Sequence, residues 1–110
     1  MTQTVEEVFI DVGRDFSRTP GGRHIAESKW SGEEFRTRLV EPALRQGKTV
    51  AISLDSAIGL STSFLEEVFG GLIRTFGAGV GDRVRIIAEA RPRRKRQALE
   101  YMQRAIADAD

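Results

Sequence analysis

The side chains that could carry out catalysis are few in this chain of 110 residues. His24 is its one histidine and it has no cysteine, which excludes thiolate chemistry and cysteine-based zinc or iron–sulfur sites. No HxH or HExxH spacing supplies a histidine-based metal site, and no G-x-S-x-G elbow, P-loop or Rossmann fingerprint is present. We therefore expect no catalytic residue, no metal, no cofactor and no enzymatic activity.

Three consecutive hydroxyl residues, Ser61, Thr62 and Ser63, precede an apolar helical repeat. A helix N-terminus offers free backbone N–H groups and the positive end of the helix dipole, and both favour negative charge. Ser63 and Glu66 have the spacing of a capping box, although Ser61 and Thr62 compete for the N-cap position. Since a cap needs one hydroxyl, the cluster is a candidate site of phosphorylation or anion binding, with capping alone as the alternative.

A second polar group surrounds the Pro-Gly-Gly turn at residues 20–22. Arg18 and Arg23 flank this turn, and Ser17 lies beside Arg18. Paired guanidinium groups favour recognition of phosphate or carboxylate through their planar forks. An ordinary surface hairpin loop is the alternative interpretation.

The basic run at residues 91–96 contains four arginines and one lysine. Such a run permits contact with nucleic-acid phosphates, but it is also typical of a solvated helix start. Aromatic residues make up 7% of the chain, and no stacking platform for bases is recognisable. We therefore expect a protein partner in preference to a nucleic acid.

The spacing of apolar residues indicates which elements position these side chains. It predicts strands at residues 5–12, 24–27, 49–54 and 83–88. It also predicts helices that begin at Ser31, at the hydroxyl cluster and at Pro92, the first two ending at Gly47 and Gly77. The order β-β-α-β-α-β-α predicts one α/β domain over residues 1–110. Its single mixed sheet has about four strands, the later ones parallel, and is packed by three helices.

Five further residues lie where they could contact an anion or a partner. Asp55 ends the central strand, and Glu66 and Glu67 are too divergent on their helix to act as an acid/base pair. Gly70 and Gly71 each cost about 1 kcal/mol in a helix interior, which indicates close approach of the backbone to the sheet or to a partner. We group these five with Ser17, Arg18 and Arg23 as candidates for anion or partner binding.

Residues 16–23, 31–36 and 61–72 resemble the motifs of a bacterial family of STAS-like domains of unknown function. STAS domains are named for sulfate transporters and anti-sigma-factor antagonists, and the resemblance covers roughly residues 8–87. It implies a STAS fold and a signalling role, with a histidine-kinase-like ATPase or its regulated target as partner. It also implies a phosphorylation switch at the hydroxyl cluster, although Leu60 and Phe64 replace the usual Asp and Gly of that switch.

These observations favour a cytoplasmic, non-enzymatic protein-interaction module of the STAS-like type. No apolar run approaches the roughly 20 residues that span a membrane, so we expect no membrane partner. The absence of cysteine is consistent with a reducing compartment. A nucleic-acid or small anionic-ligand binding domain that uses the arginine-rich segments is the alternative.

Overall fold

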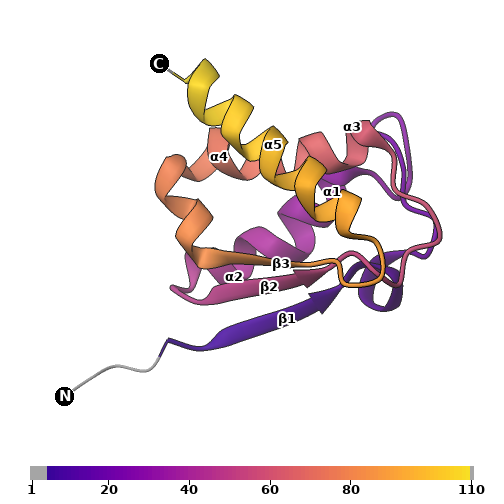
Figure 1. Ribbon diagram of the computed structural model, residues 1–110, viewed down its shortest axis with the longest axis horizontal. Helices are drawn as coiled ribbons and strands as arrows, with labels where there is room; N and C mark the ends of the chain where they lie inside the picture. Colours follow the sequence, from indigo (N-terminus) through magenta and orange to yellow (C-terminus); the bar gives the residue numbers. More distant parts are fainter. Residues whose placement is uncertain (1–4, 110) are drawn as a thin grey trace.

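Three parallel strands form the sheet of this protein, in the order β1 (Glu7–Asp11), β2 (Thr49–Ser53) and β3 (Val84–Ile87) (Figure 1). The computed structural model describes residues 5–109. The register aligns Ile10 with Ile52 and Ile52 with Ile86, so one face of the sheet carries a continuous apolar row. Because the strands are parallel, their carboxyl ends meet at one edge of the sheet.

The sheet has three strands where the sequence predicts about four. The segment 24–27, predicted as a strand, forms a turn in which the N–H of Glu27 donates to the carbonyl of His24 at 3.0 Å. Its one large apolar residue, Ile25, is 51% exposed, so the segment has no apolar face to add to a sheet. Gly22, with a φ of +85°, turns the chain toward the first helix instead, where its carbonyl accepts the N–H of Gly32. The described sheet is therefore parallel and not mixed.

Three helical regions occur where the sequence predicts three helices. The first two are each a pair of α-helices joined by a π-helical turn, which gives five α-helices in all. Their bounds are α1 (Gly32–Phe35), η2 (Arg36–Val40) and α2 (Glu41–Arg45), then α3 (Thr62–Leu65), η3 (Glu66–Gly70) and α4 (Gly71–Phe76), then α5 (Pro92–Asp108). A π-helical turn, η1 (Val12–Phe16), follows β1, and a 3₁₀ turn, η4 (Ala78–Arg83), precedes β3.

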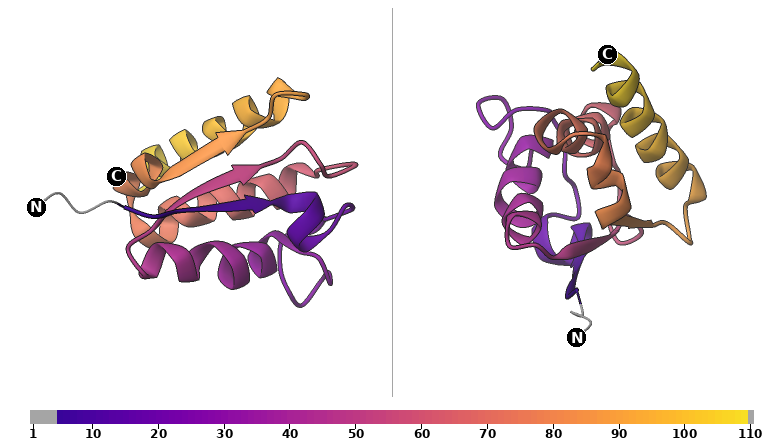
Figure 2. Two further views of the ribbon diagram at one scale, coloured as in Figure 1. Left: turned by 90° about the horizontal axis from the view of Figure 1, so that it is seen from below. Right: turned by 90° about the vertical axis from the view of Figure 1, so that its left-hand side faces the viewer.

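The helices cover one face of the sheet and leave the other open (Figure 2). Consecutive residues of β1 point to opposite faces and differ in exposure accordingly, since Ile10 is 5% exposed and Phe9 is 48% exposed. On the open face, Arg85 of β3 reaches across β2 to Glu7 of β1 at 3.0 Å. The architecture is therefore a two-layer α/β sandwich.

Aromatic side chains join the helical layer to the end of β1. Phe35 of α1 and Phe64 of α3 are fully buried, with ring centres 5.7 Å apart, and Phe16 of η1 packs on Phe35 at 5.3 Å. A Cβ on Gly32 would lie 2.8 Å from the carbonyl oxygen of Phe64, so the backbones of α1 and α3 are in contact. This contact fixes the start of the second helical region.

Within residues 5–109, no helix has the length and apolar character needed to cross a membrane.

Candidate functional site

The hydroxyl cluster, Ser61, Thr62 and Ser63, stands at the start of the helical region 62–76. The Oγ of Ser61 accepts the N–H of Phe64 at 3.1 Å, so Ser61 is the N-cap and Ser63 already lies inside the helix. Ser61 and Thr62 are exposed and Ser63 is half-buried, with its Oγ 3.3 Å from that of Ser61. Within the described residues, the Thr62 hydroxyl makes no hydrogen bond. Capping therefore uses one hydroxyl of the three.

Glu66 and Glu67 follow one turn later and both lie within reach of Arg23. Arg23 forms an ion pair with Glu66 and lies 3.5 Å from Glu67, while Arg74 binds the second oxygen of Glu66 at 2.7 Å. Hydrogen bonds from Arg74 and then Arg23 hold the pKa of Glu66 below its ordinary value of 4.5. The ion pairs of Arg23 thus connect the loop before α1 to the second helical region.

A buried ion cluster lies beside the ion pairs of Arg23. Arg36 donates to the carboxylate of Glu67 at 2.8 Å and also pairs with Glu41, and the three side chains are 9–12% exposed. A Cβ on Gly71 would lie 2.5 Å from the Nε of Arg36, so this glycine makes room for the guanidinium group. The close neighbour at Gly71 is thus a side chain of the first helical region, and not the sheet that was predicted as one candidate. At Gly70 the neighbours of such a Cβ are Glu66 and Arg74 of the same helix.

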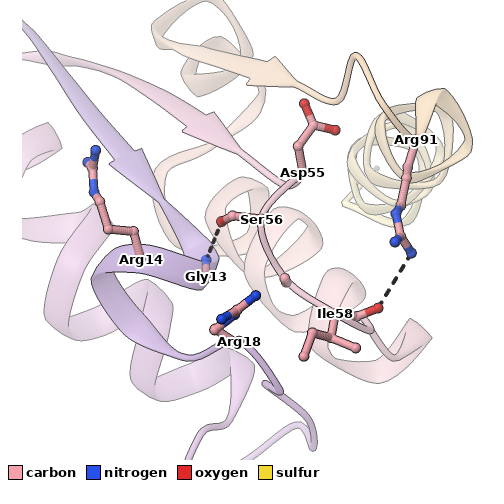
Figure 3. Close-up of a pocket in the computed structure, with 8 residues that line it drawn as sticks. Gly13, Arg14, Arg18, Asp55, Ser56, Ile58 and Arg91 are labelled. Carbon is pink, nitrogen blue, oxygen red and sulfur yellow. Dashed lines mark hydrogen bonds between the residues drawn. The ribbon is translucent and has the colours of Figure 1, made fainter.

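A cleft of about 530 Å³ lies at the carboxyl ends of β1 and β2 (Figure 3). We call it the strand-end cleft; it is lined by Gly13, Arg14, Arg18, Asp55, Ser56, Ala57, Ile58 and Arg91. Arg18 and Asp55 were predicted as candidate residues, and the structure brings them to one cavity. Ser17 does not line it, and its Oγ accepts the N–H of Thr19 at 3.1 Å within a local turn.

Hydrogen bonds between residues far apart in the sequence fix the walls of the strand-end cleft. The N–H of Gly13 donates to the Oγ of Ser56 at 2.9 Å, and Ser56 in turn hydrogen-bonds the carboxylate of Asp11. A Cβ at position 13 would overlap Ser56, so glycine is required for this approach. On the far side, the Asp55 carboxylate accepts the N–H groups of Glu89 at 2.9 Å and Ala90 at 3.1 Å, which fastens the loop after β3.

Arg94 supports the same segment from behind, although the sequence indicates it only as one member of the basic run. Its side chain donates to the carbonyls of Leu54 at 2.6 Å and Ala57 at 2.9 Å, and the residue is 8% exposed. Burial lowers the pKa of Arg94, and the neighbouring charge of Arg91 lowers it further. Helical spacing is the sequence signal that could have indicated this burial, because Arg94 lies one turn before Ala98 in the buried row of α5.

The described residues offer no metal centre, because no three His, Asp or Glu side chains of residues 5–109 gather in a suitable group. The candidate site thus consists of two separate features. The hydroxyl cluster starts the second helical region, with Arg23, Glu66 and Glu67 one turn away, and the strand-end cleft carries Arg18, Asp55 and Arg91.

Comparison with known proteins identifies one family. A family model described as a STAS-like domain of unknown function (DUF4325) matches residues 31–89, which is more than half of the chain. The matched segment runs from the N-cap of α1 to the loop after β3 and contains the hydroxyl cluster and Asp55, but not Arg18 or Arg23. No curated protein and no solved structure matches the chain.

Proposed function

The chain belongs to the family of STAS-like domains of unknown function, and we propose that it is a non-enzymatic protein-interaction module regulated at Ser61, Thr62 and Ser63. Its partner is a protein, and the resemblance to anti-sigma-factor antagonists suggests an ATPase of the histidine-kinase-like class or the target of that ATPase. The kinase would transfer the γ-phosphoryl group of ATP to a hydroxyl oxygen, with loss of the hydroxyl proton and release of ADP.

One observation carries this proposal. Three hydroxyls stand at a helix start where the cap uses only Ser61, and both Ser61 and Thr62 are exposed. The positive end of the dipole of the helical region 62–76 favours negative charge at this place. A phosphate there is therefore tolerated by the fold while it adds about −1.5 to −2 charges to the surface.

The neighbouring ion pairs explain how such a charge would be transmitted. A phosphate on Ser63 would stand one helical turn before Glu66 and Glu67, at the i+3 and i+4 positions where side chains meet. It would repel both carboxylates and compete with them for Arg23, which holds the loop before α1 to the helix. Phosphorylation would then change both the charge and the shape of the surface that a partner contacts.

Paired variants of the hydroxyl cluster test the proposal. We expect the glutamate variants S61E, T62E and S63E, compared with the matching alanine variants, to change the amount of one specific protein recovered from the native host by affinity purification. Thr37 provides the matched control, because its exposed hydroxyl lies on the first helical region, outside the cluster. The proposal fails if no protein is recovered specifically, or if T37E and T37A differ as much as the cluster variants do.

A further inference from the structure

We propose that the strand-end cleft binds a small molecule through its phosphate group, in addition to any partner engaged at the hydroxyl cluster. The inference does not rest on the function proposed above. The cleft volume of about 530 Å³ falls in the range of about 300–1,000 Å³ that is usual for small-molecule sites. Its place is also informative, because ligands of open α/β sheets bind outside the carboxyl ends of the parallel strands.

The arginines that line the strand-end cleft favour an anion. Within residues 5–109, Arg18 and Arg91 form no ion pair, whereas Arg14 is engaged by Asp15 at 2.8 Å. Arg91 and the buried Arg94 both point at the carbonyl of Ile58, at 3.4 Å and 3.3 Å. Two guanidinium groups are thus crowded on one oxygen, and a dianion close to them would relieve their repulsion.

The backbone of residues 55–58 adds donors to these side chains. Ala57 is 1% exposed, yet its N–H donates to no acceptor in the described part of the chain, and the same holds for the N–H of Ser56. Buried backbone N–H groups nearly always have a partner. An oxyanion seated between Arg18 and Arg91, the two lining arginines without an ion pair, would supply acceptors for these amide N–H groups.

The one carboxylate that lines the cleft does not oppose an anion there. Both oxygens of Asp55 accept backbone N–H groups from the loop after β3. Figure 3 shows this carboxylate turned toward that loop, while Arg18 and Arg91 approach residues 55–58 from different sides. The negative charge of Asp55 is therefore committed to holding the fold together.

The rim of the cleft indicates which kind of phosphate compound fits. Ile58 lines the cleft and is 60% exposed, so an apolar surface stands next to the arginines. An organic group attached to the phosphate would cover this side chain and gain the free energy of apolar burial. A small phosphate monoester therefore fits the cleft better than inorganic phosphate does.

Nuclear magnetic resonance titrations test the site at constant ionic strength, with inorganic phosphate, AMP and adenosine as probes. We expect saturable shifts of the amides of Gly13, Ser56 and Ala57 with phosphate, tighter binding of AMP, and no binding of adenosine. R18Q and R91Q should each weaken binding about tenfold, as expected for loss of a charge-assisted hydrogen bond. R93Q is the matched control, because Arg93 is exposed on α5 and does not line the cleft.

Three results would overturn the inference. The first is the absence of saturable binding of both phosphate and AMP. The second is equal binding of adenosine and AMP, because the phosphate group would then contribute nothing. The third is equal weakening by R93Q and R18Q, which would assign the effect to the general charge of the surface. If phosphate and AMP bind equally and R18Q and R91Q weaken both, the phosphate site stands and free phosphate is its ligand.

Discussion

Replacement of Gly71 by alanine should destabilise the protein although alanine is the better helix former. A Cβ at this position would lie 2.5 Å from the Nε and 3.0 Å from the Cδ of Arg36. Arg36 has little room to retreat, because it is held by Glu41, by the carboxylate of Glu67 and by the backbone carbonyl of Glu67 at 3.2 Å. The methyl group would therefore displace the guanidinium group from two buried carboxylates.

The size of the effect follows from two opposing contributions. Alanine gains about 1 kcal/mol over glycine in a helix interior. Removing one partner of a buried ion pair costs about 3–5 kcal/mol. The lower end of this range applies, because Arg36 would be shifted and not removed, and Glu41 keeps its ion pair with Arg45 at 3.1 Å. We expect a net loss of about 2 kcal/mol, which corresponds to a fall of roughly 10 °C in Tm for a domain of this size.

Urea denaturation followed by circular dichroism measures this loss, with G70A as the matched control. The neighbours of a Cβ at Gly70 are the ends of the Glu66 and Arg74 side chains, which are 24% and 49% exposed and can move aside. G70A should thus lie within about 1 kcal/mol of the wild type. If G71A is as stable as G70A, Arg36 is not confined by its carboxylates and the argument for the buried ion cluster is wrong.

Four further variants test other parts of the structure. The pKa of Glu66 is lowered in the folded protein, so its stabilising contribution is present above about 4.5 and is lost as the pH falls through the folded value. R74Q should therefore reduce the fall in unfolding free energy between about pH 6 and about pH 3, measured by urea denaturation. R94M should cost about 1–3 kcal/mol, because it leaves buried carbonyls without donors, and thermal unfolding checks this. S61A should cost about 1 kcal/mol and S63A less, since Ser61 is the N-cap; equal losses would contradict this assignment.

Local patterns in the sequence were sufficient to predict the three helical regions and all three strands of the sheet. Ser31 caps the first helical region as predicted, accepting the N–H of Glu34 at 3.1 Å. Gly47 and Gly77 both follow helix ends and have φ values of +82° and +92°. These features depend on neighbours within a few residues, which the sequence displays directly.

The elements that the sequence predicted wrongly depend on contacts between distant residues. The turn at 24–27 is fixed by hydrogen bonds from its flanks to the start of α1, such as that from Glu33 to the carbonyl of Arg23. Arg94 belongs to a basic run that is typical of a solvated face, and its burial depends on carbonyls 36–40 residues away. The strand-end cleft combines three separate loops; Arg18 and Asp55 were predicted as individual candidates, and Arg91 only as part of the basic run at residues 91–96.

The most direct test of the proposed function is mass spectrometry of the intact protein purified from its native host, together with everything that is bound to it. We expect a fraction of molecules to carry one phosphate, located at Ser61, Thr62 or Ser63, and a second protein to be recovered in a fixed ratio. The ratio should differ between the phosphorylated and unphosphorylated fractions. An unmodified protein recovered alone would contradict the proposal of a phosphorylation-regulated interaction module.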